Sequence, residues 1–202
     1  MGYLMLRLKA IGLAIAVGAL AMACGGADEG NGGDVCLTEG SGDRTSYPAA
    51  PYGTEECSVI SDHSFVDGEG AAVTLGGIYA DADAKVLLLT TSAGWCPACI
   101  EEQPTLEAWH NTYVSQGLRV VGTLFADEND SPVGAEYAAN WQTQYNLTFP
   151  VVADTEQVLS AYYDSSKAPM NMIINVATMQ IVRVIVGADT ATVQSIIEAG
   201  LQ

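Results

Sequence analysis

The segment KVLLLTTSAGWCPACIEEQPTLEAWHNTY, residues 85–113, joins an apolar run to a Cys-x-x-Cys motif and then to a helical pattern. Residues 85–91 have the length and continuous apolar character of a strand that is buried on both faces of a sheet. After Pro97, apolar residues recur close to the helical period: Ile100, Leu106, Trp109 and Tyr113. Gly117 is suited to end the helix. The segment therefore predicts a buried strand that turns, at the motif, into a helix over residues 97–116.

The two cysteines of the motif, Cys96 and Cys99, lie at the predicted start of this helix. Unpaired N–H groups and the positive end of the helix dipole stabilise a thiolate there, which lowers its pKa below the usual value of about 8.5. We expect an exposed Cys96 sulfur to attack a disulfide and a shielded Cys99 to resolve the mixed disulfide. Pro97 costs no hydrogen bond at the first helical position, and Trp95 is expected to cover the sulfurs on one side.

Two other interpretations of the motif are open. A structural zinc site would need two more ligands, and Cys36 and Cys57 lie far upstream without the spacing of a zinc knuckle. An inert structural disulfide would close too small a loop to stabilise the fold much. The sequence therefore favours a redox-active pair, with no metal and no cofactor expected.

The rest of the chain from about residue 52 alternates strands and helices. A turn-forming segment at residues 67–70 between two short apolar runs predicts a hairpin over residues 64–75. Apolar patterns predict further strands over residues 118–125, 148–152, 170–176 and 180–186, and further helices over residues 132–145, 155–163 and 190–201. This alternation predicts an α/β fold in which helices cover both faces of a central sheet.

Residues 1–23 predict an export signal. Arg7 and Lys9 supply its positive charge, and the 13 apolar residues that follow are too few to span a bilayer, which takes about 20. Ala21-Met22-Ala23 permits ordinary cleavage, whereas the same residues followed by Cys24 resemble a bacterial lipoprotein signal, in which the cysteine is lipidated. We expect a chain on the periplasm side of the cell envelope, lipid-anchored, or secreted if Cys24 is unmodified. Either compartment permits disulfides.

Residues 24–51 are rich in Gly, Asp, Ser and Pro, which predicts a flexible tether in front of a single domain over residues 52–202. Cys36 and Cys57 flank the end of this tether. The simplest interpretation is a structural disulfide that fixes the tail to the domain. The alternative is a second redox pair that exchanges with the first.

The chain is strongly acidic, with 7 Lys and Arg against 24 Asp and Glu among 202 residues and a net charge of −17. Loss of the signal leaves five basic residues and a net charge of −19. Such a charge disfavours nucleic-acid binding and a polybasic membrane patch. The hydrophobic content of 49% excludes a fully disordered chain. Since the five cysteines cannot all pair within the chain, Cys24 is the one we expect outside a disulfide.

The motifs resemble those of the thioredoxin-fold thiol–disulfide oxidoreductases of the TlpA/ResA type, which neighbour the redoxins. The shared features are the W-C-x-x-C sequence, Glu102 and Pro104 after its second cysteine, the Phe-Pro-Val segment at residues 149–151, and Ala168-Pro169 before an apolar run. The resemblance covers residues 52–202. It implies a thioredoxin-like fold, in which helices flank a central mixed β-sheet, with an N-terminal β-hairpin and a central insertion.

The resemblance also implies roles for single residues. Pro169 would form the family's cis-proline beside the disulfide, and Ala168 would pair with a substrate chain next to Trp95 and Pro97. Glu102 would relay a proton. A plain trans-proline and a solvated helix carboxylate are the respective alternatives.

Two departures from the family pattern bear on the redox chemistry. Thr90 stands where thioredoxin itself keeps a buried Asp, six residues before the first active-site cysteine, so proton transfer at Cys99 would use Glu102, water or another route. Ala98 stands where proline is common. Because the dipeptide between the cysteines helps set the redox potential, the direction of electron flow stays open.

These observations predict a membrane-tethered thiol–disulfide oxidoreductase that exchanges disulfides with protein substrates and with an upstream redox partner. A peroxidase of the peroxiredoxin kind is one alternative, although Leu89 and Ala93 stand where that class carries Pro and Thr. A non-enzymatic module that binds a metal or a partner is another.

Overall fold

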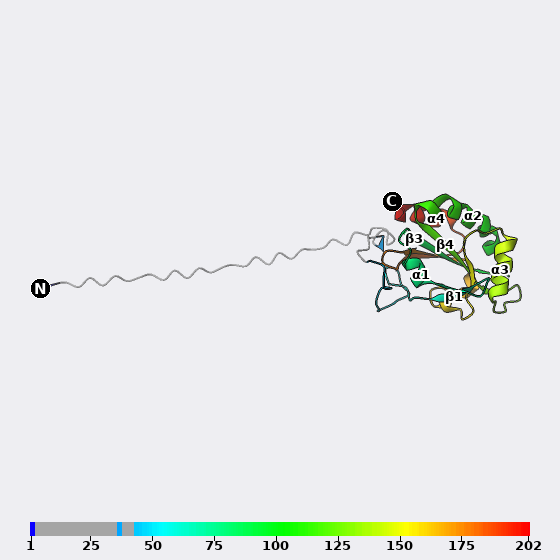
Figure 1. The fold of residues 1–202 in the computed structure, drawn as a ribbon, viewed down its shortest axis with the longest axis horizontal. Coiled ribbons are helices and arrows are strands. Elements are labelled where there is room, and N and C mark those ends of the chain that lie inside the picture. The colour runs from blue at the N-terminus through cyan, green and yellow to red at the C-terminus, as the bar shows by residue number, and fades with distance from the viewer. Residues whose placement is uncertain (3–35, 38–42) are drawn as a thin grey trace.

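The structure is a computed structural model that describes residues 1–2, 36–37 and 43–202. Its centre is one seven-stranded mixed sheet with the order β2-β1-β5-β4-β3-β6-β7 (Figure 1). The strands are β1 (Ser64–Asp67), β2 (Ala72–Thr74), β3 (Val86–Ala93), β4 (Leu118–Ala126), β5 (Val151–Ala153), β6 (Met170–Asn175) and β7 (Gln180–Val186). The α-helices are α1 (Leu75–Tyr79), α2 (Pro97–Tyr113), α3 (Ala135–Gln144) and α4 (Thr190–Gly200). The described residues also form the short 3₁₀ helices η2 (Val114–Gln116), η3 (Val158–Ala161) and η4 (Ser165–Lys167).

Strand β3 occupies the middle of the sheet. It pairs in parallel with β4 and antiparallel with β6, and all eight of its residues are buried. The hairpin β1–β2 joins the sheet through antiparallel pairing of β1 with β5. The predicted mixed α/β sheet with an N-terminal hairpin is therefore confirmed.

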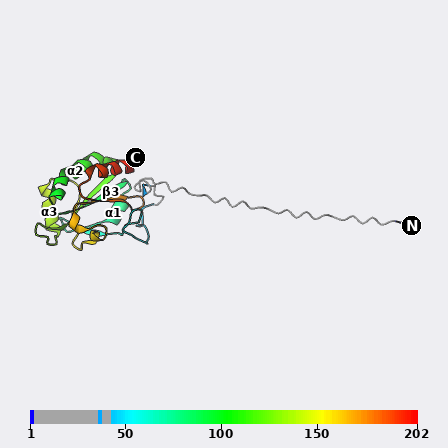
Figure 2. The same ribbon diagram turned by 180° about the vertical axis from the view of Figure 1, so that it is seen from behind.

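Helices cover the two faces of the sheet unequally. Helices α2 and α4 lie on one face and α1 on the other, as the opposite views of Figures 1 and 2 show. Residues Val86 and Leu88 of β3 pack toward α2 and α4, whereas Leu87 and Leu89 pack toward α1. The alternation follows from the two-residue period of a strand.

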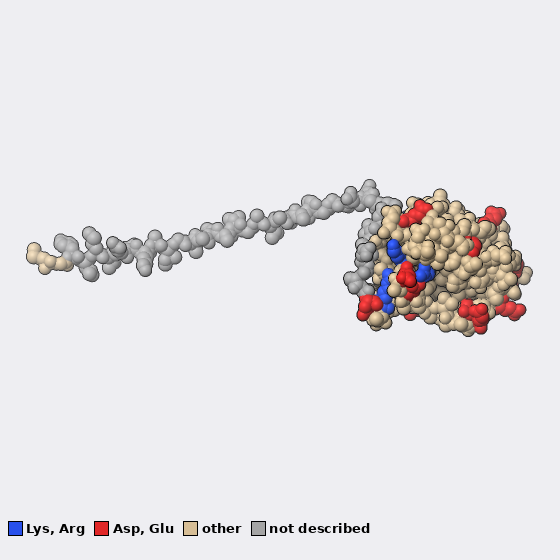
Figure 3. Space-filling view, turned by 45° about the horizontal axis from the view of Figure 1, so that its top comes forward, with Lys and Arg blue, Asp and Glu red and all other residues tan. Residues whose placement is uncertain are grey.

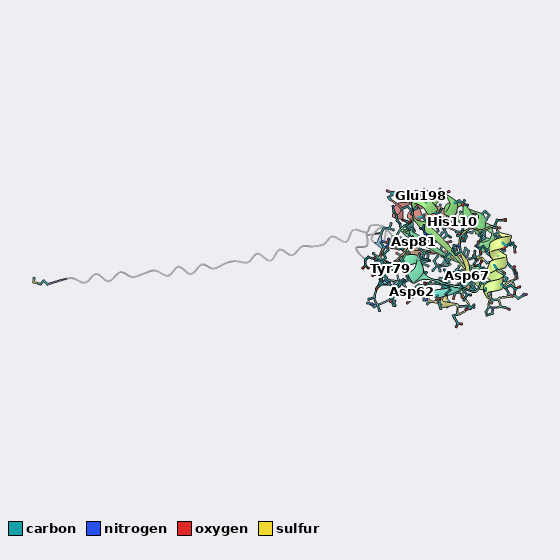
Figure 4. All side chains as sticks on the ribbon, in the orientation of Figure 1. Asp62, Asp67, Tyr79, Asp81, His110 and Glu198 are labelled. Carbon is teal, nitrogen blue, oxygen red and sulfur yellow. A yellow bond between two sulfur atoms is a disulfide. The ribbon has the colours of Figure 1, made fainter. Side chains whose placement is uncertain are left out.

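The labelled side chains of Figure 4 follow the same division. His110 and Glu198 lie on the side of α2 and α4, and Tyr79 and Asp62 lie on the side of α1. In Figure 3, Asp and Glu are spread over the visible face of the domain, whereas Lys and Arg gather toward one end of it.

The long helix forms as predicted. Pro97 opens α2, Pro104 lies inside it, and Gly117 follows η2 with a left-handed φ of 113°. An added Cβ at Gly117 would lie 3.0 Å from the Asp83 carbonyl oxygen. Glycine is therefore favoured there both by the left-handed backbone and by the lack of space for a side chain.

The helix predicted over residues 155–163 is wrong, because only the four-residue 3₁₀ helix η3 forms there. Gln157 has a left-handed φ of 51°, which an α-helix does not permit. The Asp154 carboxylate accepts hydrogen bonds from the N–H groups of Val158 and Leu159 at 2.9 and 3.1 Å. Helix α1 was missed by the sequence patterns because it has only five residues.

Residues upstream of position 52 also contact the domain. Arg44 donates hydrogen bonds to the carbonyl oxygens of Asp81 and Ala84 at 2.7 and 2.8 Å. The Tyr47 hydroxyl donates to the Ile60 carbonyl oxygen at 2.9 Å. The predicted signal peptide beyond residue 2, and Cys24, lie outside the described residues. Within the described part of the chain, no helix is long and apolar enough to cross a membrane.

Candidate active site

Cys96 and Cys99 form a disulfide at the start of α2, with their Cα atoms 5.3 Å apart. Cys96 is the N-cap residue of the helix, and its sulfur accepts a hydrogen bond from the Cys99 N–H at 3.1 Å. A donor in this position stabilises negative charge on the Cys96 sulfur when the pair is reduced. The helix start thus favours Cys96 as the thiolate of the pair.

Both cysteines are buried in the disulfide form, with Cys96 3% and Cys99 0% exposed. The expected exposure of the first sulfur is therefore wrong for this form. Trp95, Ala98 and Ala168 are only partly buried and pack around the pair. These three residues form the partly exposed cover of the disulfide.

Trp95 is held in place beside the disulfide. Its indole N–H donates to Asp130 Oδ1 at 2.9 Å, and its ring meets Phe125 edge to face with centroids 6.1 Å apart. A cavity of about 470 Å³ opens next to it, lined by Trp95, Phe125, Glu128, Asn129, Asp130, Gln157, Ser165 and Ser166. Pro97, by contrast, is exposed at the start of α2.

Ala168 and Pro169 approach the disulfide from a distant part of the chain. The peptide bond between them is cis, and Ala168 packs against the cluster that contains both cysteines. The following residue, Met170, donates its N–H to Thr91 Oγ1 at 3.2 Å, while the Pro169 carbonyl oxygen accepts from Gly187 N–H at 2.8 Å. These two bonds attach the peptide group directly after the proline to β3 and to the residue that follows β7.

Glu102 lies one turn after Cys99 on the buried side of α2 and is 3% exposed. Its Oε1 accepts a hydrogen bond of 2.8 Å from the Asn171 side-chain amide. Burial raises the pKa of Glu102 to about 7, against a smaller lowering by the Asn171 hydrogen bond. The alternative of a solvated helix carboxylate is thus wrong, and the group can hold or release a proton near neutral pH.

Gln103, which the sequence patterns did not single out, also contacts the redox pair. Its side-chain amide donates to the Cys99 carbonyl oxygen at 2.7 Å and lies 3.4 Å from Ser92 Oγ. A polar residue four positions after Cys99 on a helix is a weak signal, because its burial depends on what the helix packs against.

Cys36 and Cys57 form a second disulfide, with Cα atoms 5.4 Å apart and Cys36 1% exposed. The Cys36 carbonyl oxygen accepts from Asn175, which pairs with Val86 at the start of β3. The redox pair follows the other end of β3, so the eight residues of that strand, roughly 25 Å, separate the two disulfides.

A buried strand, a Cys-x-x-Cys pair that caps the following helix, and a cis-proline beside that pair are the features of a thioredoxin-fold redox protein. Solved structures share this fold. A thiol:disulfide interchange protein of Chlorobium tepidum TLS matches with a TM-score of 0.56 at 20% identity, covering 77% of this chain and all 100% of that one. StoA from Bacillus subtilis matches with a TM-score of 0.52 at 20% identity, and the match covers 74% of this chain and 98% of StoA.

Sequence comparison is more specific. Residues 58–186 match the AhpC/TSA family. The thiol-disulfide oxidoreductase ResA of Bacillus subtilis is 30% identical over 149 residues, which cover 72% of this chain and 77% of ResA. The thioredoxin-like protein YneN of the same organism is 28% identical over 132 residues, which cover 64% of this chain and 71% of YneN. The chain belongs to the AhpC/TSA family, among the thioredoxin-fold thiol–disulfide oxidoreductases of the TlpA/ResA type.

Proposed function

We propose that this chain is an exported, membrane-tethered enzyme that exchanges disulfides with protein substrates through Cys96 and Cys99. The observation that carries the proposal is the position of the pair, at the start of α2 and beside Ala168 and Pro169. The name of the relative ResA supports the reaction class. The signal-like residues 1–23 and Cys24 support export and a lipid anchor.

The exchange would begin at Cys96. In the reduced protein its thiolate, stabilised by the Cys99 N–H, attacks one sulfur of a substrate disulfide. A new bond joins Cys96 to the substrate, and the other substrate sulfur leaves as a thiolate. Trp95 and Ala168, which are partly buried around the pair, are the residues we expect the substrate to contact.

Cys99 would then release the substrate. Its thiol loses a proton to the Glu102 carboxylate, and the resulting thiolate attacks the Cys96 sulfur of the mixed disulfide. The Cys96–Cys99 disulfide forms, the bond to the substrate breaks, and the second substrate sulfur leaves. The two electrons that reduce the substrate come from the enzyme dithiol, which an upstream redox partner would restore.

The Cys36–Cys57 disulfide would have a structural role. Cys36 is buried against the helix-covered face of the sheet, and the pair lies at the other end of β3 from Cys96. Direct exchange between the two pairs would need the sulfurs to meet, which the intervening strand prevents. We propose that this bond fixes the end of the tether to the domain.

Reduction of insulin disulfides by the purified chain, with dithiothreitol as electron donor, tests the function. We expect acceleration by the wild-type chain, none by Cys96→Ser, and a trapped mixed disulfide with Cys99→Ser. The double variant Cys36→Ser, Cys57→Ser is the matched control and should retain the activity. Unchanged turnover in Cys96→Ser would refute the mechanism, and consumption of hydrogen peroxide in place of disulfides would indicate a peroxidase.

A further inference from the structure

A buried polar layer lies between α2 and the sheet, one helical turn beyond Cys99. Thr90 of β3 and Asn171 of β6 are cross-strand partners, so their side chains point to the same face. That is the face of α2, because Glu102 reaches Asn171 from this helix. Thr90, Glu102 and Asn171 are 0%, 3% and 0% exposed.

The hydrogen bonds in this layer leave one carboxylate oxygen free. The Asn171 side-chain amide donates a hydrogen bond of 2.8 Å to Glu102 Oε1. Glu102 Oε2 has no hydrogen-bond partner among the described residues. A buried carboxylate oxygen without a partner is costly to keep, and such groups are concentrated where proton chemistry needs them. Asn171 comes from a strand that is 69 residues away in the chain, so this bond is a tertiary contact and not a helical one.

We propose that Asn171 is a positioning residue, which holds Glu102 by Oε1 and leaves Oε2 as the atom that takes the proton from Cys99. The inference rests on the proposed function, in which Glu102 is the proton acceptor. When the Cys99 S–H bond breaks, the proton forms a bond to Oε2 and the electron pair stays on the Cys99 sulfur. The Asn171 amide, donating to Oε1, stabilises the carboxylate form before that transfer.

Asn171 is suited to this task by its chemistry as well as its place. An amide keeps its donor at every pH, so the contact survives both protonation states of Glu102. A carboxylate or an apolar group at the same point of β6 would remove the donor. The buried Glu102 carboxylate would then have no hydrogen bond from Asn171, and its ionised form would become less stable.

Charged groups of the neighbouring elements α2, α4 and β7 are exposed or engaged elsewhere. Glu101 of α2 is exposed. Glu198 of α4 accepts from the Tyr113 hydroxyl, and Arg183 of β7 pairs with Glu56 at 3.0 Å. Burial and the Asn171 bond are accordingly the two influences on the pKa of Glu102. Along α2, Cys99 of the redox pair is the titratable group one turn before Glu102.

The test is the pH dependence of single-turnover insulin reduction by the reduced chain between pH 5 and 9. In the wild-type chain the rate should rise with ionisation of Glu102. Asn171→Leu, which removes the donor at similar volume, should move this rise upward by about one pH unit, so that the rate at pH 6 falls about tenfold. Asn171→Asp, an isostere without the amide, should shift the rise in the same direction. It replaces the leucine variant in the test if that variant does not fold.

Asn175→Leu is the matched control, because Asn175 is a buried asparagine of the same strand that bonds the Cys36 carbonyl oxygen at the far end. Its pH profile should equal that of the wild-type chain. In a Glu102→Gln background, Asn171→Leu should have no further effect on the profile, because Asn171 acts through Glu102.

The outcomes separate the two proposals. A folded Asn171 variant with an unmoved profile, in a chain whose profile does depend on Glu102, would overturn the role of Asn171 alone. A wild-type chain that does not reduce insulin, or a Glu102→Gln variant with the wild-type profile, would overturn the proposed mechanism and this inference with it.

Discussion

The side-chain amide of Asn175 donates a 2.9 Å hydrogen bond to the carbonyl oxygen of Cys36, a residue 139 positions earlier in the chain. Cys36 is also joined covalently to Cys57, whose N–H donates to the Ile181 carbonyl oxygen at 2.7 Å. The bonds attach residue 36 to the ends of β6 and β7 nearest the start of β3. Cys36 is thus held at the end of the sheet opposite the redox pair.

Removal of the Cys36–Cys57 disulfide should destabilise the domain without affecting its chemistry. The bond spans 21 residues, and a crosslink over such a loop contributes about 3 kcal/mol by limiting the unfolded chain. Urea unfolding of Cys36→Ser, Cys57→Ser should show this loss in the free energy of unfolding, with insulin reduction unchanged at temperatures where the variant is folded. A stable variant with altered disulfide exchange would instead favour a redox role for this pair.

Glu102→Gln should stabilise the disulfide form above neutral pH. The pKa of Glu102 is about 7 in the folded chain against an ordinary value of 4.5, so between these values the folded state holds a proton that the unfolded state has lost. The free energy of unfolding of the wild-type chain therefore falls as pH rises through this window, by about 3 kcal/mol in all.

The neutral Gln side chain does not incur this loss. Denaturant unfolding at pH 5 should give wild type and Glu102→Gln nearly equal stability, and at pH 8 the variant should be the more stable of the two. If the two proteins differ in their free energy of unfolding by the same amount at both pH values, Glu102 does not titrate in this range.

Gly94→Ala should disturb the turn between β3 and the redox pair. A Cβ at Gly94 would lie 2.7 Å from the Glu128 backbone nitrogen and would also contact the Tyr137 hydroxyl, so backbone as well as side chain must move. Overpacking of this kind costs about 1–3 kcal/mol. We expect lower thermal stability together with slower insulin reduction.

Gly134→Ala is the control for this change, because an added Cβ there meets nothing within 4 Å. It should cost at most about 1 kcal/mol, through the N-cap position of α3 that Gly134 occupies. Similar losses in the two variants would contradict the steric argument at Gly94.

Thr90→Val should raise stability by about 1 kcal/mol. The Thr90 hydroxyl is buried and has no hydrogen-bond partner among the described residues, and valine has nearly the same shape without the polar atom. The bond from Thr123 Oγ1 to the Thr90 carbonyl oxygen, 2.9 Å long, is made by the backbone and is retained. Thermal unfolding of the two proteins side by side measures the difference, and a lower midpoint for the variant would show that the hydroxyl is satisfied.

Local sequence was enough to predict much of this protein. The apolar run of β3, Pro97 at the first position of α2 and Gly117 after η2 are consequences of chain stereochemistry and period, so the strand, the helix and the place of the cysteines followed from residues 85–117. Asp154 shows the limit of such patterns. Its carboxylate bonds the backbone at Val158 and Leu159, and a 3₁₀ helix forms where apolar spacing predicted an α-helix.

Tertiary structure alone decided the properties of the site. The sequence places Glu102 one turn after Cys99, but its pKa depends on burial and on Asn171. Likewise, the sequence suggested the pairing of Cys36 with Cys57. The distance of that disulfide from the redox pair depends on the register of β3 with β6. Spacing along a chain fixes local geometry, whereas desolvation and contacts between distant strands exist only once the sheet and its helices have packed.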